Sequence, residues 1–245
     1  MRNPQKIAGL TACALAILCT SVGAQDLVQL KKSLSENLQG NTTIEEVSKT
    51  EIPGIYEVRV NDVEFFYTNE SGRFLLTGKL IDMKSKRNLT DEKIDKITAI
   101  KFRDLPASDS ITYTRGDGSR KVAIFADPNC GYCKRFETEL LKVDNITVSV
   151  YVLPILGVDS TAKAKAVWCA PEKNKVWLEY MTKEKAIPMT TPACDTEAIT
   201  RNLSFARRHA IRGTPAVYFQ NDRKVGGYID AKQVEAILAE AEKKS

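Results

Sequence analysis

The feature that most constrains the fold of this chain is a pair of cysteines, Cys130 and Cys133, separated by two residues. The pair follows a short apolar run, residues 122–125, and precedes residues 134–137, whose composition is typical of a helix. A cysteine at the beginning of a helix faces unpaired backbone N–H groups and the positive end of the helix dipole, which favour its thiolate. The second cysteine lies one turn further on, close enough to form a disulfide with the first. We therefore expect a strand-to-helix junction that carries a reversible dithiol.

Two other uses of this cysteine spacing are less well supported. A structural zinc site needs two further Cys or His ligands, but the chain has one histidine, His209, and its other cysteines form no second pair with this spacing. A purely structural disulfide between Cys130 and Cys133 would restrain the unfolded chain little, because the loop is very short. The sequence favours redox chemistry, and we expect neither a metal nor a cofactor.

The first 24 residues have the pattern of a secretory signal peptide. Arg2 and Lys6 give a positive start, residues 7–19 form an uncharged and largely apolar run, and Val22-Gly23-Ala24 supplies the small residues that a signal peptidase recognises. The apolar run is too short to span a bilayer. A lipoprotein signal around Cys13 and an uncleaved anchor are the alternatives, but this cysteine comes very early in the run. We predict export with cleavage after Ala24.

The mature chain, residues 25–245, is close to charge balance. The chain has 36 basic and 31 acidic residues, and the signal holds two of the basic ones and none of the acidic ones, which leaves a net charge of +3. This balance gives no support to nucleic-acid binding. The length allows one large domain or two small ones.

Four cysteines remain in the mature chain, at positions 130, 133, 169 and 194. An even number in an exported protein favours disulfides, and four cysteines allow three pairings. We expect Cys130 to pair with Cys133, and Cys169 with Cys194.

Residues 25–84 predict a small α+β module. Leucines recur at spacings of three and four over residues 26–38, which indicates an amphipathic helix. Two strands follow, in which apolar residues alternate with polar ones: Val58 and Val60, then Val63, Phe65 and Tyr67. Residues 73–81 predict a further strand. A module of this size buries little core alone, so we expect it to dimerise, with packing on the rest of the chain as the alternative.

Residues 85–107 predict a linker helix. Thr90 can cap a helix that has Asp91 and Glu92 in its first turn. The segment 91–104 is charged on most faces and has a narrow apolar stripe, which is typical of a spacer between two domains. An ordinary surface helix is the alternative.

Residues 108–245 predict an α/β domain. Strands at residues 111–115 and 121–126 are expected to form a hairpin through Gly116-Asp117-Gly118. The cysteine helix and a strand over residues 146–152 follow, and residues 160–206 are helical in composition with breaks near Pro188 and Pro192. Strands at residues 216–219 and 225–228 and a final helix after Asp230 complete the domain. This order resembles a thioredoxin-like domain with a helical insertion.

Local motifs make the resemblance more specific. The chain resembles the exported disulfide isomerases of the DsbC/DsbG family, and more closely the DsbC branch, over nearly the whole mature protein. Besides the Cys130 pair, the shared motifs are Phe125-Ala126-Asp127, Trp168-Cys169-Ala170, Cys194-Asp195 and Gly213-Thr214-Pro215-Ala216. The resemblance implies a periplasmic homodimer joined through the N-terminal modules, with some chaperone character. It implies misfolded exported proteins with non-native disulfides as substrates, and a membrane thiol reductase of the DsbD type as the partner that keeps the pair reduced.

The resemblance also implies roles for single residues. Cys130 corresponds to the attacking thiolate, Cys133 to the resolving thiol, and Gly131-Tyr132 to the dipeptide that tunes the thiolate. Thr214 and Pro215 correspond to a cis-proline loop that binds substrate. Cys169 and Cys194 bracket the insertion with its two proline-containing breaks, so we expect a structural disulfide there, with a regulatory or second redox pair as the alternative.

Two points remain open in the sequence. Thioredoxins proper carry a buried acid six residues before the first cysteine, where this chain has Ile124, so no carboxylate partner for the proton of Cys133 is evident. Asp127 is more typical of a turn or capping residue than of an acid catalyst.

The alternative functions are a DsbG-like redox chaperone or sulfenic-acid reductase, and a dithiol oxidase.

Overall fold

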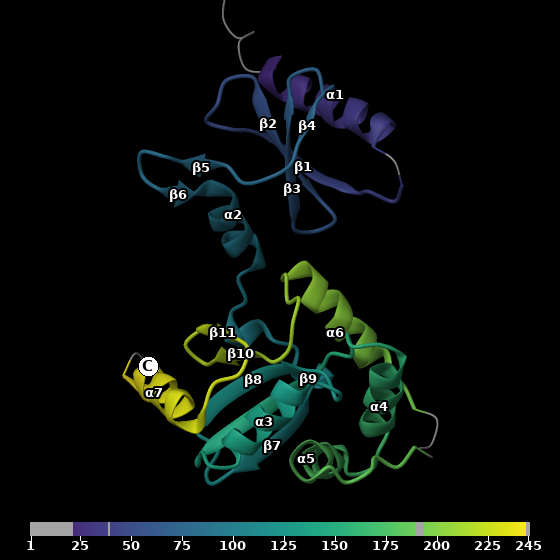
Figure 1. Ribbon diagram of the computed structural model, residues 1–245, viewed down its shortest axis with the longest axis vertical. Helices are drawn as coiled ribbons and strands as arrows, with labels where there is room; N and C mark the ends of the chain where they lie inside the picture. Colours follow the sequence, from purple (N-terminus) through teal and green to yellow (C-terminus); the bar gives the residue numbers. More distant parts are fainter. Residues whose placement is uncertain (1–21, 39, 190–193, 244–245) are drawn as a thin grey trace, which may run out of the picture. The chain divides into compact units, whose positions relative to one another are not determined.

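The computed structural model describes residues 22–38, 40–189 and 194–243, and it divides into two compact units between Gly78 and Lys79. Each unit has its own hydrophobic core. Figure 1 labels the helices and strands of both units. The sequence placed the end of the N-terminal module at residue 84, a few residues later. Residues 1–21, which include most of the predicted signal, lie outside the described residues. In the described part of the chain, no helix is long and apolar enough to cross a membrane.

The first unit consists of helix α1 (Val22–Asn37) packed against a four-stranded antiparallel sheet. The strands lie in sequence order: β1 (Ile44–Lys49), β2 (Ile55–Val60), β3 (Glu64–Asn69) and β4 (Leu75–Leu76). Leu30 and Leu34 of the helix pack on Val58 and Val60 of the sheet, as the leucine spacing requires. The strand predicted over residues 73–81 is reduced to the two residues of β4 at the edge of the sheet.

Of the residues predicted to be buried in and beside β3, Val63 and Tyr67 are confirmed, and the prediction of Phe65 is wrong. Phe66, not Phe65, packs in the core, opposite Val58 in the β2–β3 pair. Tyr67 is also buried, and its side chain projects from the other face, where its hydroxyl donates to the Glu57 carboxylate at 3.4 Å. Because both faces of this strand are partly covered, alternation alone does not identify the core face.

The second unit begins with a short hairpin of β5 (Ile81–Asp82) and β6 (Arg87–Asn88), followed by helix α2 (Leu89–Thr98). Asn88 caps this helix by accepting a hydrogen bond from the Asp91 N–H, so the prediction of Thr90 as the cap is wrong. Thr90 lies inside the first turn, and its hydroxyl accepts a bond from the Leu80 N–H. The helix ends well before the predicted residue 104, and two short 3₁₀ turns follow: η1 (Phe102–Asp104) and η2 (Ala107–Asp109).

A five-stranded sheet lies at the centre of the second unit, with the strand order β11-β10-β8-β9-β7. Its strands are β7 (Ile111–Arg115), β8 (Arg120–Ala126), β9 (Ile146–Val152), β10 (Ala216–Phe219) and β11 (Lys224–Gly226). β8 and β9 are parallel, and the other neighbours are antiparallel.

The predicted hairpin of β7 and β8 is wrong, because β9 lies between these strands. The alternating residues of β9 from Ile146 to Val152 are all fully buried, whereas β7 exposes every second residue. A strand with this many buried apolar residues gains the most hydrophobic stabilisation when it lies between two other strands. The half-exposed β7 is suited to the edge of the sheet. The Gly116 turn carries the chain past the end of β9, where the Asn145 side chain accepts a bond from the Asp117 N–H.

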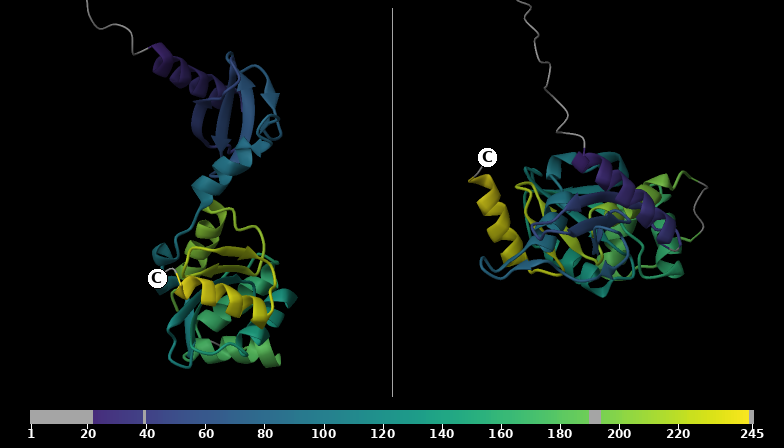
Figure 2. Two further views of the ribbon diagram at one scale, coloured as in Figure 1. Left: turned by 90° about the vertical axis from the view of Figure 1, so that its left-hand side faces the viewer. Right: turned by 90° about the horizontal axis from the view of Figure 1, so that it is seen from above.

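Helices cover both faces of this sheet. Helix α3 (Gly131–Leu140), α5 (Lys173–Lys183) and the C-terminal α7 (Ala231–Glu242), drawn in yellow in Figure 2, share one core with the sheet. Helix α6 (Glu197–Arg208) contributes Ile199 to this core and Ala206 to the second core, which lies on the other face. The predicted helix after Asp230 is confirmed as α7, and Asp230 and Gln233 form a capping box at its start. Helices α4 (Val158–Trp168), α5 and α6 form the insertion between β9 and β10. The predicted break at Pro188 follows α5, and Pro192 lies outside the described residues.

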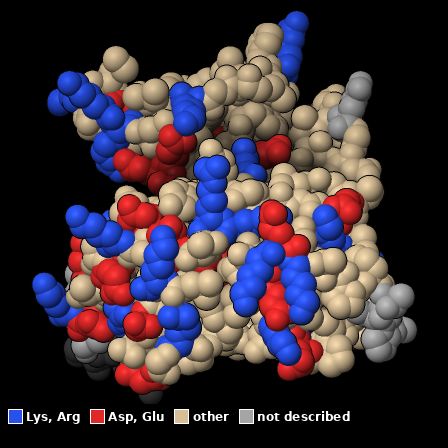
Figure 3. Space-filling model, turned by 60° about the horizontal axis from the view of Figure 1, so that its bottom comes forward, with Lys and Arg blue, Asp and Glu red and all other residues tan. Residues whose placement is uncertain are grey.

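Basic and acidic side chains are interspersed on the face of the molecule in Figure 3. The charges on that face form no broad patch of one sign. This distribution agrees with the near balance of charge in the sequence.

Candidate active site

Cys130 occupies the position just before the first turn of α3, which follows the buried strand β8. The Cys130 sulfur accepts a hydrogen bond from the Cys133 N–H at 3.1 Å, as a helix-capping side chain does. The N–H of Cys130 in turn donates to the Asp127 carbonyl at 3.1 Å, which fixes the turn into the helix. The attacking sulfur is therefore held where the free N–H groups of the helix converge.

The Thr214-Pro215 segment lies against Cys130, although it is 84 residues away in the sequence. The peptide bond between Thr214 and Pro215 is cis, and the Thr214 carbonyl oxygen is 3.4 Å from the Cys130 sulfur. Pro215 is buried, and Thr214 is partly exposed at the mouth of the site. The structure thus brings together the two segments that the sequence had assigned to one site.

The two cysteines have opposite acidities, and both are free thiols in this structure. A hydrogen bond from the Cys133 thiol, together with backbone N–H groups of α3, lowers the pKa of Cys130 to about 6. Burial, together with the neighbouring Cys130 thiolate, raises the pKa of Cys133 far above the usual thiol range. At neutral pH Cys130 is therefore the nucleophile, and Cys133 needs help to lose its proton.

Between the two cysteines, Gly131 and Tyr132 are exposed. Tyr132 is 59% exposed, and the Arg135 guanidinium lies 5.5 Å from the centre of its ring. A Cβ at Gly131 would meet no atom within 4 Å, so no lack of space excludes a side chain there. The dipeptide therefore faces outward, beside the reactive sulfur.

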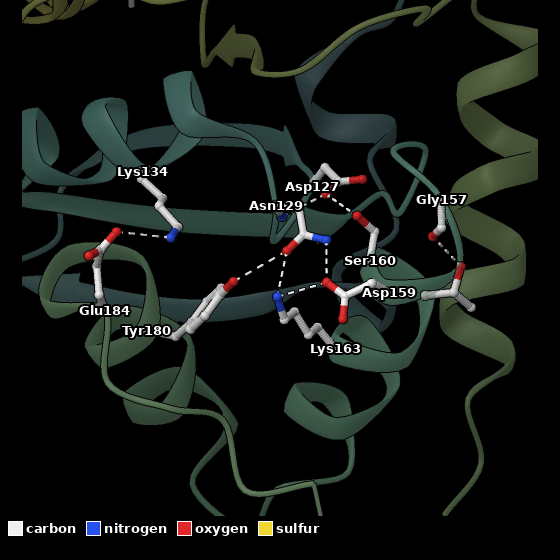
Figure 4. Close-up of polar contacts among 10 residues, drawn as sticks. Asp127, Asn129, Lys134, Gly157, Asp159, Ser160, Lys163, Tyr180 and Glu184 are labelled. Carbon is white, nitrogen blue, oxygen red and sulfur yellow. Dashed lines mark hydrogen bonds and ion pairs between the residues drawn. The ribbon is translucent and has the colours of Figure 1, made fainter.

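Asp127 is fully buried and organises the loops around the site (Figure 4). Its Oδ1 accepts bonds from the Asn129 N–H and the Ser160 hydroxyl, both at 2.7 Å. Its Oδ2 accepts bonds from the N–H groups of Ile155 and Leu156, at 2.7 and 2.9 Å. These contacts are those of a turn residue, as expected for Asp127, and they join the cysteine loop to the segment after β9.

The Asn129 side chain connects the cysteine loop to the helical insertion (Figure 4). Its amide nitrogen donates to Asp159 at 2.7 Å, and its amide oxygen accepts from Lys163 at 2.8 Å and from Tyr180 at 3.3 Å. Lys134 also lies over the Tyr180 ring, 4.8 Å from its centre. No local signal in the sequence identifies a role for Asn129, because these partners come from α4 and α5, more than 25 residues away.

Glu137 is the acidic residue of the site that the sequence prediction missed. Its side chain is fully buried and accepts hydrogen bonds from the Tyr113 hydroxyl and the Trp177 Nε1–H, both at 2.6 Å. Burial raises the pKa of Glu137 to about 7. A carboxyl group four residues after Cys133 on a helix was the available signal, since residues at this spacing share one face. Ile124, at the thioredoxin position for the acid, lies in the core.

Cys169 and Cys194 are joined by a disulfide with a Cα–Cα distance of 5.7 Å. It connects the end of α4 to the segment before α6, within the insertion. His209 ends α6, where its Nδ1 lies 3.1 Å from the Thr98 carbonyl oxygen, so it contacts the end of α2. Among the described residues, no group of three or more Cys, His, Asp or Glu side chains is placed to hold a metal ion.

Comparisons with known proteins agree with this geometry. A family model described as a thioredoxin-like domain matches residues 107–242, and a model described as the N-terminal domain of the disulfide bond isomerase protein matches residues 21–91. The probable thiol:disulfide interchange protein DsbC of Bordetella pertussis is 37% identical over 185 residues, which cover 76% of this chain. DsbC of Escherichia coli is 26% identical over 204 residues, which cover 81% of this chain and 82% of that protein.

A solved structure of a disulfide interchange protein from Neisseria gonorrhoeae matches with a TM-score of 0.53 and 35% identity, over 56% of this chain and 97% of that one. The matched part spans 65% of the Bordetella pertussis relative, which is less than two thirds of its length. The thioredoxin-like model nevertheless covers more than half of this chain, and the isomerase N-terminal model precedes it. The chain therefore belongs to the DsbC family of thioredoxin-like proteins.

Proposed function

We propose that this protein is a periplasmic thiol:disulfide isomerase and reductase that acts on misfolded exported proteins with non-native disulfides. The observation that carries the proposal is the environment of Cys130, a thiol of lowered pKa at a helix N-terminus that faces the cis Thr214-Pro215 bond. An extended substrate segment can bond the backbone beside Pro215 and so bring its disulfide to the Cys130 sulfur.

The reaction follows from this arrangement by thiol–disulfide exchange. The Cys130 thiolate attacks one sulfur of a substrate disulfide, a mixed disulfide forms, and the other substrate sulfur leaves as a thiolate. That thiolate attacks a different substrate disulfide, and a further exchange releases Cys130 unchanged, which completes an isomerisation. When the rearrangement stalls, Cys133 attacks the Cys130 sulfur, the substrate leaves reduced, and the pair becomes a disulfide.

The acidity of Cys130 also favours the dithiol form of the pair. Stabilising the thiolate stabilises the reduced protein relative to the disulfide, so the pair is a good oxidant that a dithiol donor reduces readily. An isomerase needs a free thiolate at the start of each cycle. We propose that a membrane thiol reductase of the DsbD type supplies these electrons.

We further propose that the protein is a homodimer joined through its N-terminal units. The match to the isomerase N-terminal model supports this assembly. The edge strand β4 also exposes apolar side chains, with Leu75 and Leu76 each 51% exposed and the preceding Phe74 57% exposed. An exposed apolar edge strand is a template for pairing with a second chain.

A refolding assay tests the proposed function. A substrate with scrambled disulfides is incubated with the wild-type protein, with Cys130→Ser and with Cys133→Ser. We expect Cys130→Ser to abolish recovery of native substrate, and Cys133→Ser to keep partial recovery while substrate accumulates as a mixed disulfide. Recovery by Cys130→Ser at the wild-type rate would contradict the proposal, and suppression of aggregation without recovery by the wild type would favour the redox-chaperone alternative.

A further inference from the structure

Glu137 is a fully buried acid that accepts two hydrogen bonds in the core of the second unit. Glu137 lies on α3, Tyr113 on the edge strand β7 and Trp177 on the insertion helix α5, and all three side chains are buried. Both donors point at the carboxylate, one at each oxygen. Burying a carboxyl costs more than burying an apolar side chain of similar size, so stability alone does not account for an acid at this position.

Cys133 and Glu137 are one helical turn apart on the same face of α3. Side chains four residues apart on a helix have Cβ atoms about 6 Å apart, and they lean toward the helix N-terminus. The Glu137 side chain therefore leans toward the turn that carries Cys133. Both residues are buried, with exposures of 1% for Cys133 and 0% for Glu137, so bulk water has little access to the Cys133 thiol.

The exchange chemistry proposed above requires a proton acceptor at this place. Cys133 can attack the mixed disulfide only as a thiolate, yet burial opposes its ionisation. We propose that Glu137 is the general base that takes the proton of Cys133 when the mixed disulfide is resolved, and the general acid that returns it when the pair is reduced. This inference rests on the proposed exchange function and names a further residue of the same site.

Each step balances. The Glu137 carboxylate takes the proton of the Cys133 thiol, and the sulfur attacks the Cys130 sulfur. The bond from Cys130 to the substrate breaks, its electron pair leaves with the substrate thiolate, and the Cys130–Cys133 disulfide forms. When the thiolate of a dithiol donor later attacks Cys130, Cys133 leaves as a thiolate and receives the proton stored on Glu137.

Few titratable or charged groups other than Cys133 face the Glu137 carboxyl and could exchange a proton with it. Tyr113 of β7 faces it directly, and Arg115 of the same strand acts on the Tyr113 hydroxyl. Helix α5 presents Trp177, whose indole does not titrate in this range, and the facing residues of β8 and β9 in this core are apolar. The pKa of Glu137, about 7, matches a group that must both accept and return a proton near neutral pH.

The test separates the two chemical steps of the reaction with oxidised glutathione. Full-length reduced protein is mixed with oxidised glutathione between pH 5.5 and 9, quenched with acid and analysed by mass spectrometry. Appearance of the glutathione adduct reports attack by Cys130, and its decay to the internal disulfide reports attack by Cys133. Cys130 does not titrate in the second step, because its sulfur is already in the disulfide.

We expect the second step of the wild type to show an inflection near pH 7. Glu137→Gln should slow this step about 100-fold at pH 8 and remove the inflection, because general-base catalysis contributes on the order of 10²–10⁴ in rate. The first step should change less than about twofold. Glu139→Gln is the matched control on the same helix: its carboxylate bonds Lys142 and the Ala231 N–H, and both steps should keep wild-type rates.

Tyr113→Phe gives a second test that does not remove the acid. It deletes a donor to the charged form of Glu137, so the inflection should move above pH 7. An inflection near pH 7 that persists in Glu137→Gln, equal slowing of both steps, or an unmoved inflection in Tyr113→Phe would overturn the inference. If Glu137→Gln does not fold, the Tyr113→Phe profile decides. Failure of the first step in the wild type would instead refute the proposed exchange function.

Discussion

Replacing Asp127 should show how strongly the loops around the site depend on one buried carboxylate. In Asp127→Ala, three backbone N–H groups lose their acceptor: those of Asn129, Ile155 and Leu156. A buried donor left without a partner costs about 1–3 kcal/mol. Taking about 1.5 kcal/mol for each of the three groups, the free energy of unfolding should fall by about 4–5 kcal/mol.

Asp127→Asn should cost about half as much. The amide oxygen can still accept the two N–H bonds from Ile155 and Leu156, and the Ser160 hydroxyl can rotate to accept from the new NH₂ group. Only the Asn129 N–H then loses its partner, together with the extra strength of bonds to a charged acceptor. We expect a loss of about 2–3 kcal/mol.

Urea unfolding of the reduced proteins measures these values, provided that the slope of the transition stays unchanged. Asp159→Ala is the control, because the Asp159 side chain is 65% exposed and its ion pair with Lys163 contributes less than about 1 kcal/mol. A loss below about 1 kcal/mol in Asp127→Ala, or an equal loss in both Asp127 variants, would refute the claim that the carboxylate holds these loops.

Four further predictions concern the thiols, the units and the Cys169–Cys194 disulfide. Ultraviolet absorbance of the reduced protein should show the Cys130 thiolate titrating near pH 6, and Cys133→Ala should raise this pKa because the donating thiol is lost, whereas Cys133→Ser should raise it less. The Cys130 pKa is lower in the folded than in the unfolded chain, so the reduced protein should gain stability as the pH rises from about 6 to 9. Its urea midpoint should rise over this range relative to the midpoint of the oxidised protein. A constant difference between the two midpoints would contradict this. A shortened protein that begins at Ala99 lacks the first unit together with β5, β6 and α2. It should be monomeric by light scattering, keep reductase activity and lose most isomerase activity. Full isomerase activity in that monomer would show that the deleted part is not needed for the mechanism. Replacing both Cys169 and Cys194 by Ser should lower the free energy of unfolding by about 3.5 kcal/mol, from the loop of 26 residues that the disulfide closes, and an unchanged urea midpoint would show that this loop does not restrain the unfolded chain.

Local signals in the sequence were enough for the elements that carry the chemistry. The apolar run before Cys130 predicted β8, the strict alternation over residues 146–152 predicted β9, and Asp230 predicted the start of α7. Each of these signals depends only on neighbouring residues. The pairing of distant strands does not, and for this reason the β7–β8 hairpin was wrong although both strands were located correctly.

Glu137 and Asn129 were missed for the same reason: their roles depend on partners on other elements. These partners are Tyr113 and Trp177 for Glu137, and Lys163 for Asn129. A glutamate in a helix is ordinarily taken as exposed, and only the packing of α5 on α3 reverses that. Thr214 and Pro215 were located in advance because family resemblance, and not spacing, identified them.

The strand order of the second unit also has a consequence for how the protein folds. β7, β8 and β9 lie within about forty residues of sequence, so they can associate early, whereas β10 follows the whole insertion. Because contacts between distant segments form slowly, we expect Thr214 to reach Cys130 among the last events of folding. In the folding chain, then, the Cys130 sulfur is in place before Thr214 reaches it, and the site is complete only when the whole second unit has folded.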